Sequence, residues 1–193
     1  MEVLIFDQME QCTEAEVQRL LPLVSPQRRE QALRFKHTFG QFCCLKSWLM
    51  LKEGMRELGI RELGDFQYNE HGKPYIEGGP YFSISHCKQG IAVAIDDQPV
   101  GIDIEGIRHA EEDLIERTMN EEERLRIRGL EVRGLEDRKF TRLWTQKEAI
   151  VKAQGVGIVS FEQLQTILDN GQWTLDTVEK EKYIYSIAIW KIM

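Results

Sequence analysis

The stretch Gln98-Pro-Val-Gly-Ile-Asp-Ile-Glu105 predicts the strand around which the rest of the chain is arranged. Its apolar and acidic residues alternate, and successive side chains of a strand point to opposite faces. Asp103 and Glu105 are therefore expected on one face, about 7 Å apart along the strand. Two interpretations stay open: an ordinary amphipathic strand with a solvated acidic face, or a site for a hard cation. Mg²⁺ in particular binds one or two carboxylates together with waters and phosphate oxygens.

Length and composition predict a folded protein without membrane segments. The 193 residues fit one large domain or two small ones, and a hydrophobic fraction of 42% is enough for a core. No apolar run reaches the roughly 18 residues of a membrane helix, and the first residues carry an acid where a signal peptide carries bases. The four cysteines lack zinc or disulfide spacing, so we expect free thiols in the cytoplasm.

The net charge of −7 argues against a nucleic-acid partner, but it conceals a basic segment. The residues that form this arginine-rich segment are Arg124, Arg126, Arg128, Arg133, Arg138, Lys139 and Arg142. Such a segment is typical of a solvated helix face and also suits an acidic protein partner. A second basic group lies at Arg28, Arg29, Arg34, Lys36 and His37.

The chain reads as two halves with the same order of elements. Thr13 with Glu16 has capping-box spacing, and Ser25 before Pro26 is typical of a second helix start. Apolar spacing from residue 28 to 54 predicts helix with a break near Gly40, ended by Gly54 and Gly59. A tight connection at residues 97–99 separates residues 1–97 from residues 98–193. Because each half reads strand, helices, strands, we expect an α+β fold built from two similar halves, each with a small, mainly antiparallel sheet.

Residues 137–153 carry the strongest helix pattern, and one lysine does not fit it. Lys147 falls in the middle of the apolar stripe, where a lone ammonium would cost on the order of several kcal/mol. Thr145 with Glu148 has capping-box spacing, and Glu148 with Lys152 forms an ordinary helix ion pair. That interpretation leaves Lys147 unexplained, whereas a metal or phosphate site beside the helix would accommodate all three charges.

Four motifs then follow one another in a recognisable order. Gly72-Lys-Pro74 and Phe82-Ser-Ile-Ser-His86 precede Val100-Gly-Ile-Asp-Ile-Glu105, and Trp144-Thr-Gln-Lys-Glu-Ala-Ile-Val-Lys152 comes last. Together they resemble the signature of the 4′-phosphopantetheinyl transferases. The length and the division at residues 97–99 are similar to the larger, monomeric branch of that family, the surfactin-synthetase-activating type. Ser25-Pro26 with Arg28-Arg-Glu30 extends the likeness towards the amino end.

The resemblance implies a pseudo-twofold fold and a reaction. Enzymes of that family move phosphopantetheine from coenzyme A to a serine of an apo carrier protein (acyl, peptidyl or aryl) and release 3′,5′-ADP. By likeness, Asp103, Glu105 and Glu148 would hold Mg²⁺, with Mn²⁺ as an alternative ion. Lys152 would stabilise or protonate the leaving 3′,5′-ADP, and either Glu148 or Glu123 would take the proton of the carrier serine.

The same likeness assigns contacts with the coenzyme and leaves alternatives open. The implied contacts are Arg28, Lys73 with Pro74, Ser85, His86 and Lys152. Gln31 and Cys43-Cys44 depart from the residues that relatives often have there. One alternative is a Mg²⁺-dependent hydrolase that cleaves a nucleotide pyrophosphate with water as acceptor, and another is a non-catalytic coenzyme A-binding module. Release of 3′,5′-ADP without carrier protein would favour the hydrolase.

Overall fold

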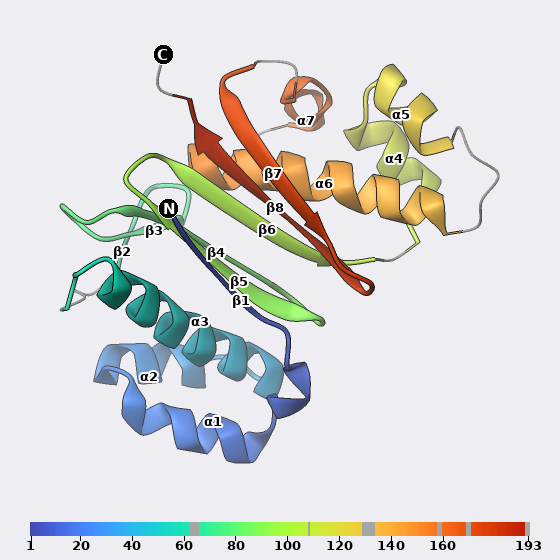
Figure 1. Cartoon of the computed structure of the whole chain (residues 1–193). Coiled ribbons are helices and arrows are strands. Elements are labelled where there is room, and N and C mark those ends of the chain that lie inside the picture. The colour runs from blue at the N-terminus through green and yellow to red at the C-terminus, as the bar shows by residue number, and fades with distance from the viewer. Residues whose placement is uncertain (62–65, 108, 129–133, 158–159, 169–170, 192–193) are drawn as a thin grey trace.

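The computed structural model describes residues 1–61, 66–107, 109–128, 134–157, 160–168 and 171–191. Two three-stranded antiparallel sheets lie next to each other in the middle of the molecule (Figure 1). The first has the order β1-β5-β4 and the second β6-β8-β7. Their strands are β1 (Glu2–Phe6), β4 (Tyr81–Cys87), β5 (Gly90–Asp96), β6 (Val100–Gly106), β7 (Trp173–Glu179) and β8 (Tyr183–Trp190).

Helices accompany each sheet, so the predicted α+β class is confirmed. The helices are α1 (Glu14–Leu20), α2 (Pro26–Leu33), α3 (Thr38–Glu57), α4 (Glu112–Thr118), α5 (Glu121–Arg128), α6 (Leu135–Gln154) and α7 (Phe161–Thr166). Two short 3₁₀ turns, η1 (Met9–Gln11) and η2 (Leu21–Leu23), flank α1, and β2 (Gln67–Tyr68) pairs with β3 (Pro74–Tyr75). In each large sheet the first strand pairs with the last, which also pairs with the middle one. The order is therefore the same in both sheets, while the pseudo-twofold relation stays a prediction.

The expected helix starts are confirmed by their caps. The Thr13 hydroxyl accepts a hydrogen bond from the Glu16 amide at 3.2 Å, at the start of α1. The Ser25 hydroxyl accepts one from the Arg28 amide at 3.2 Å, with Pro26 in the first position of α2. These bonds satisfy amide groups that have no partner inside the helix.

Two glycines were wrongly predicted to interrupt or end helices. Gly40 lies inside α3, and the chain leaves helix earlier, at residues 34–37. A Cβ at Gly40 would come within 2.7 Å of the Phe35 ring, so this glycine makes room for an aromatic side chain. Gly54 is likewise inside α3, where it packs under Ile95 and Leu4. At both positions a glycine is required because neighbouring side chains pack against its backbone. The helix ends at Glu57, shortly before Gly59, whose φ is +84°.

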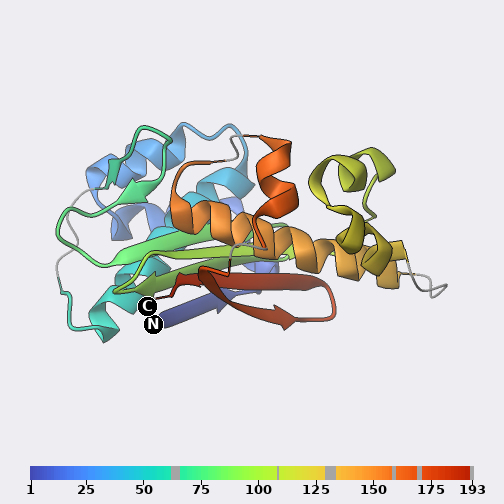
Figure 2. The ribbon, with the colours of Figure 1, turned by 90° about the horizontal axis from the view of Figure 1, so that it is seen from above.

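A shared core joins the two halves across the turn at residues 97–99. Ala92 and Ala94 of β5 pack with Ile102 and Ile104 of β6, and all four are fully buried. The Ser83 hydroxyl of β4 also accepts a hydrogen bond from the Ile102 amide at 3.1 Å. Figure 2 shows α6 lying along the sheets, where it packs on β6 and β8. This junction of α6, β6 and β4 is where the predicted residues Ser85, Asp103 and Lys152 meet.

Two further expectations concern helices and cysteines. α3 and α6 have 20 residues each, but neither they nor the other helices within the described ranges have an apolar run that could cross a bilayer. All four cysteines are free thiols, as their spacing predicted.

Candidate active site

Lys152, Asp103 and Ser85 meet where α6, β6 and β4 come together. The Lys152 ammonium donates to Asp103 Oδ1 at 2.6 Å and to Ser85 Oγ at 2.8 Å. Ser85 Oγ donates in turn to Asp103 Oδ1 at 2.9 Å and accepts from the Ile104 amide at 3.4 Å. The Ser85 hydroxyl, from the first sheet, thus contacts both Asp103 and Lys152 of the second half.

Asp103 is buried, so the interpretation of a solvated acidic face fails at this position. Only 3% of the residue is exposed, between the fully buried Ile102 and Ile104. Its Oδ1 accepts two hydrogen bonds, whereas its Oδ2 has no partner among the described residues. Buried carboxylate oxygens are seldom left without a partner, and such an atom points to a ligand or ion that would complete the site.

Glu148 lies one turn before Lys152 and shares the electrostatic environment of the strand acids. Burial is the main cause that raises the pKa of Glu148. The charges of Asp103 and Glu105 raise it further, whereas Lys152 lowers it. The three acids therefore lie close enough to influence one another. Nevertheless, within the described ranges no three Asp, Glu, His or Cys side chains are gathered as they would be around a metal ion.

The donor set fits a hard cation, although the acids are not gathered around one point. Asp103, Glu105 and Glu148 offer carboxylate oxygens, which are the ligands that Mg²⁺ prefers, and Asp103 Oδ2 is unpartnered within the described structure. The cation next to Asp103 in the structure is the Lys152 ammonium. Lys152 therefore pairs with the strand acid, in place of the simple helix pair with Glu148 that the sequence suggested.

Two cavities open on Lys152, and the residues predicted to bind the coenzyme line them. The larger, of about 640 Å³, is lined by Arg28, Ser85, His86 and Lys152 among others. The smaller, of about 260 Å³, is lined by Lys73, Glu148 and Lys152. Pro74 lines both. The structure thus brings together side chains that are far apart in the sequence.

Arg28 is held rigidly at the wall of the larger cavity. Its Nε and Nη2 donate to the Cys44 carbonyl at 3.2 and 3.0 Å, and its Nη1 donates to Gln31 Oε1 at 3.1 Å. The guanidinium also lies over the rings of Trp48 and Phe66, 5.5 and 5.2 Å from their centroids. Gln31, which departs from the family pattern, therefore helps to position Arg28 through its side chain, whereas Cys44 does so through its backbone carbonyl. Sequence reasoning missed this role.

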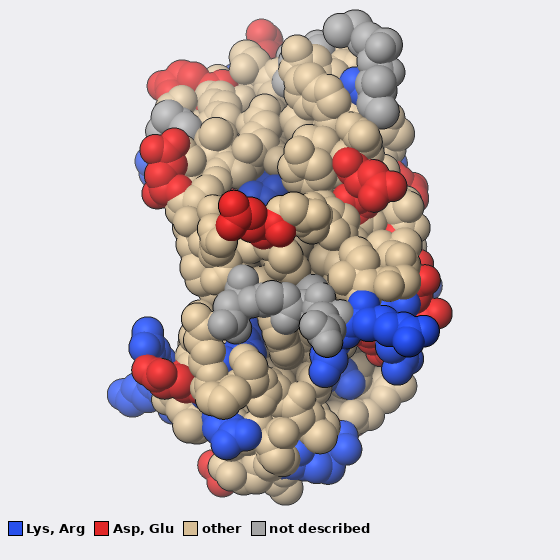
Figure 3. All heavy atoms as spheres, turned by 90° about the vertical axis from the view of Figure 1, so that its left-hand side faces the viewer, with Lys and Arg blue, Asp and Glu red and all other residues tan. Residues whose placement is uncertain are grey.

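Basic side chains also gather on one part of the surface. In Figure 3, Lys and Arg predominate in the lower part of the view, where Figure 1 shows α1–α3, and Asp and Glu predominate in the upper part. The chain as a whole is negatively charged, but Arg28 and Arg34 are among the residues that line the larger cavity.

Lys73 is held by backbone carbonyls at the edge of the smaller cavity. Its ammonium donates to the carbonyl oxygens of Ala153 at 3.1 Å and Val100 at 3.4 Å. Burial lowers the pKa of Lys73 to about 8. Asn69 Nδ2 donates to the Gly155 carbonyl at 2.8 Å nearby. Lys73 thus ties the end of α6 to the start of β6, and its contact with a coenzyme phosphate stays a prediction.

His86 stands at the end of β4 against an aromatic ring. Its imidazole meets Phe39 edge-on, with ring centroids 5.8 Å apart. The protein packed around the ring, followed by the charge of Lys152, lowers the pKa of His86, although the residue as a whole remains exposed. A phosphate bound here would oppose that shift, since a negative charge favours the protonated imidazole.

Comparison with known proteins agrees with this geometry. The sequence model of the 4′-phosphopantetheinyl transferase superfamily matches residues 99–188, which include the acids of β6 and the charged residues of α6. This part of the chain therefore matches that superfamily. The matched range contains the predicted metal and catalytic residues, whereas Arg28, Lys73 and His86 lie before it.

Curated phosphopantetheinyl transferases are similar over a larger part of the chain. A 4′-phosphopantetheinyl transferase of Bacillus subtilis is 31% identical over 147 residues, which cover 74% of this chain and 65% of that protein. The transferase Sfp of Bacillus subtilis strain 168 is 27% identical over 150 residues, covering 76% and 66%. The transferase gsp of Aneurinibacillus migulanus is 36% identical over 93 residues, covering 48% and 39%. The chain thus spans about two thirds or less of the length of these relatives.

The first lysine of the phosphopantetheinyl transferase motif on α6 has a buried partner that the sequence interpretation did not foresee. The Lys147 ammonium donates to Glu123 Oε2 at 2.7 Å and to the carbonyl oxygens of Thr118 and Leu164. Glu123 Oε2 also accepts from the Asn120 amide at 2.8 Å. The buried pair with Glu123 therefore accounts for Lys147 by a structural role, and a metal or phosphate site is not needed to explain this lysine. The signal was present, because a lysine within an apolar stripe requires a buried acid.

This location separates the two candidate bases of the predicted transferase site. Glu148 lines the smaller cavity beside Lys152. Glu123 is 4% exposed, and its hydrogen bonds are with Lys147 and Asn120, neither of which lines a cavity that contains Lys152. A role for Glu123 as base stays a prediction, and no contact among the described residues supports it.

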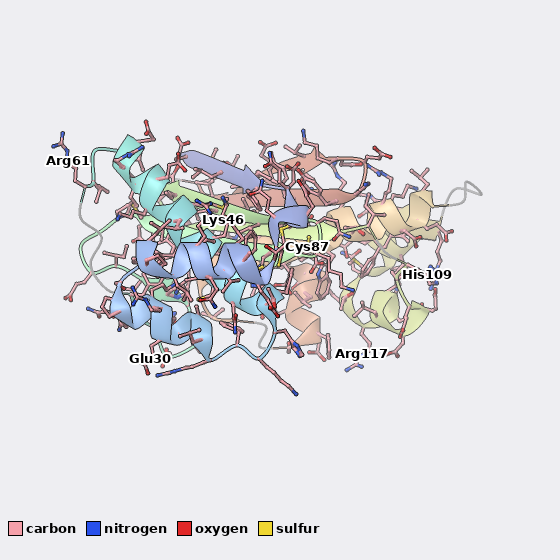
Figure 4. The ribbon with its side chains drawn as sticks, turned by 90° about the horizontal axis from the view of Figure 1, so that it is seen from below. Glu30, Lys46, Arg61, Cys87, His109 and Arg117 are labelled. Atoms are coloured by element: carbon pink, nitrogen blue, oxygen red, sulfur yellow. The ribbon has the colours of Figure 1, made fainter. Side chains whose placement is uncertain are left out.

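The arginine-rich segment, which was expected to suit an acidic protein partner, is largely neutralised by neighbouring acids. Arg124 and Arg128 both pair with Glu116, at 2.6 and 2.5 Å. Arg142 pairs with Glu179 at 2.7 Å. On the neighbouring helix α4, Arg117 projects outward (Figure 4) and lies 4.2 Å over the ring of Phe161. Arg133, another predicted member of the segment, lies outside the described residues.

Proposed function

We propose that this chain transfers 4′-phosphopantetheine from coenzyme A to a serine of an apo carrier protein and releases 3′,5′-ADP, with Mg²⁺ as the metal. The observation that supports this most is the position of Lys152 and Glu148. They lie one turn apart on α6, next to the buried Asp103, at cavities lined by every residue predicted to contact the coenzyme. The named transferases among its relatives support the same reaction.

The larger cavity suits the phosphorylated nucleotide end of coenzyme A. Arg28, Arg34 and Lys152 bring positive charge to its lining, and no Asp or Glu is among the residues that line it within the described structure. Arg28 is fixed by its carbonyl and aromatic contacts, so it would meet a phosphate without further loss of side-chain freedom. The positive charge and the aromatic contacts of Arg28 in this cavity support binding of a phosphorylated nucleotide.

The reaction breaks a pyrophosphate bond, and negative charge grows on the bridging oxygen. Fixed positive charge is the chief means of lowering the barrier of such transfers. Lys152 would supply that charge and protonate or stabilise the leaving 3′,5′-ADP. When bound by Asp103, Glu105 and Glu148, Mg²⁺ would neutralise part of the pyrophosphate charge.

Glu148 is the base that the geometry favours. Its carboxylate lines the cavity next to Lys152, and its pKa is raised, chiefly by burial and then by the charge of Asp103. A carboxylate with a raised pKa is a stronger base, which suits removal of the proton from a serine hydroxyl. Glu148 would therefore accept this proton as the oxygen attacks phosphorus.

The carrier protein would dock on α5. Leu125 is 66% exposed in the middle of this helix, flanked by Arg124 and Arg126. An apolar side chain within a charged rim suits the helix beside the serine of an acidic carrier protein. We expect Leu125→Asp to raise the KM for the carrier protein while the KM for coenzyme A stays unchanged. Reversal of Arg124 and Arg128 is a poorer test, because both also pair with Glu116.

The deciding experiment is the intact mass of an apo carrier protein after incubation with this chain, coenzyme A and Mg²⁺. The expected result is the mass gain of phosphopantetheine, abolished by Asp103→Ala and retained by Asp176→Ala, an exposed acid on β7. Release of 3′,5′-ADP without carrier protein would identify a hydrolase. If neither a mass gain nor release of 3′,5′-ADP is observed, the chain is a binding module and not an enzyme of either class.

Two further proposals concern the state of the protein. We expect a monomer, because one chain supplies both the cavity proposed for the nucleotide and the acids beside it. A cytoplasmic location agrees with the four free thiols. Size-exclusion chromatography with light scattering checks the first proposal.

A further inference from the structure

We propose that Lys152 acts as the counter-ion of Asp103 until a divalent ion and the coenzyme bind together and displace it. The proposal rests on the proposed function, since it concerns the same metal and the same pyrophosphate. It adds an order of events: the ion alone competes with the lysine and binds weakly, and the coenzyme removes that competition.

The geometry of Asp103 requires a nearby positive charge. Its side chain is 4% exposed, and the Lys152 ammonium lies 2.6 Å from Oδ1. A buried carboxylate without a cation would be strongly destabilised, so Lys152 supports the folded site as well as the reaction. Ser85 holds both groups, because its hydroxyl contacts the ammonium at 2.8 Å and Oδ1 at 2.9 Å.

The Lys152 ammonium can also leave Asp103 for another anionic partner. Its side chain is 29% exposed and lines both cavities, so the ammonium can reach an anion bound in either one. Asp103 Oδ2, which is unpartnered within the described residues, remains available as a ligand oxygen. Asp103 and Glu105 both raise the pKa of Glu148, after burial, so the charges of the three acids act on the same region.

A divalent ion and the ammonium cannot both stay beside Asp103 without repulsion. Like charges a few ångströms apart repel strongly where little water separates them. A pyrophosphate changes this balance, because it offers the ammonium a new anionic partner and offers the ion further oxygens. Coenzyme and ion should therefore bind cooperatively, each strengthening the binding of the other by the same factor.

The test is binding of Mn²⁺ alone, measured by electron paramagnetic resonance of the free ion, without coenzyme or carrier protein. Lys152→Met should bind Mn²⁺ at least about tenfold more tightly than the unaltered chain, since the competing charge is gone. Lys139→Met is the matched control, because it removes an equal charge from α6 at a residue that bonds the Arg126 carbonyl instead of Asp103. Its Mn²⁺ affinity should stay within about twofold.

The same titration with coenzyme A present completes the cycle. Coenzyme A should strengthen Mn²⁺ binding by a larger factor in the unaltered chain than in Lys152→Met. Equal Mn²⁺ affinities of these two proteins without coenzyme would overturn the proposal. Lys152→Gln, which keeps a hydrogen-bond donor, replaces the methionine variant if circular dichroism shows that the latter does not fold.

The unaltered chain gives an independent answer. If its Mn²⁺ affinity is the same with and without coenzyme A, the proposed displacement is wrong whatever the variants do. Failure of this proposal and of the proposed function can be told apart. A chain that modifies carrier protein but shows no Lys152 effect loses only the displacement, and a chain with the effect but no mass gain loses only the transfer.

Discussion

The Lys147 ammonium lies 2.7 Å from Glu123 Oε2, and both side chains are almost fully buried, at 0% and 5% exposure. The same ammonium donates to the carbonyl oxygens of Thr118 and Leu164. One lysine of α6 therefore contacts the C-terminal end of α4, the acid of α5 and the backbone of α7. Removal of one partner of such a buried pair leaves a charge without compensation.

Lys147→Met should lower the free energy of unfolding by about 3–5 kcal/mol, because Glu123 would stay buried without a cation. The double variant Glu123→Leu with Lys147→Met should lose much less than the sum of the single variants. Urea unfolding measures the free energy of unfolding of the unaltered chain, of both single variants and of the double variant. Lys139→Met, at a half-buried residue of α6 whose ammonium bonds the Arg126 carbonyl, should change stability by about 1 kcal/mol or less. Additive effects of the Lys147 and Glu123 single variants would show that these two residues do not act as a pair.

The two candidate bases should differ in rate rather than in stability. Glu148→Gln should reduce the transfer kcat by about 10²–10⁴-fold with little loss of stability, since it removes the base beside Lys152. Glu123→Gln should lower stability but leave kcat per folded molecule within a few-fold. Single-turnover mass spectrometry at a temperature where both variants are folded provides the rates. The reverse ranking would make Glu123 the base.

Ser85 and Ser83 form a matched pair for testing the link between the sheets. Each hydroxyl accepts a hydrogen bond from an amide of β6, but only Ser85 also contacts Lys152 and Asp103. Ser85→Ala and Ser83→Ala should each cost about 1–3 kcal/mol of stability. Only Ser85→Ala should slow the transfer, by about tenfold or more. Equal rates in the two variants would limit Ser85 to a structural role.

Gly101 should not tolerate a side chain. A Cβ there would overlap the Ala149 carbonyl oxygen and lie 2.5 Å from the Ala153 amide nitrogen, so β6 and α6 would have to separate. Gly101→Ala should therefore lose about 3 kcal/mol or more, or fail to fold. The atoms nearest to a Cβ at Gly106, on the same strand, belong to the end of the Gln89 side chain, which can move. Thermal unfolding of both checks this, and similar melting temperatures would contradict it.

Lys73 should give stability a pH dependence at alkaline pH. Its pKa is about 8 in the folded protein because of burial, compared with an ordinary value of 10.5. Between these values the unfolded chain binds more protons, so the free energy of unfolding rises with pH. The stability of the unaltered chain relative to Lys73→Met should therefore increase from about pH 8 to 10.5 and be level below pH 7.

Urea unfolding at several pH values measures this difference, and Lys88→Met is the control. Lys88 is exposed in the turn between β4 and β5, so its removal should leave the pH dependence as it is. A constant difference between the unaltered chain and Lys73→Met across this range would mean that Lys73 is not buried as a charge.

Local sequence patterns predicted much of the fold. The caps at Thr13 and Ser25 and the alternation of residues 100–105 predict their elements because they depend on bonds and spacings between near neighbours. The order of four motifs predicted the family for the same reason, since motif spacing is a property of the chain. The predictions at Gly40 and Gly54 were wrong because a glycine can be required either by a turn or by a closely packed neighbouring side chain. The sequence does not distinguish these two reasons.

The partners of the charged residues were decided only by the tertiary structure. The sequence by itself determined that Asp103, Glu105, Glu148 and Lys152 are present on a strand and a helix of the right kind. It did not determine that Lys152 pairs with Asp103 or that Lys147 takes Glu123, which lies 24 positions away. The physical reason is that a buried charge must find a counter-charge, and the nearest one in space is fixed by how α6 packs on β6 and α5.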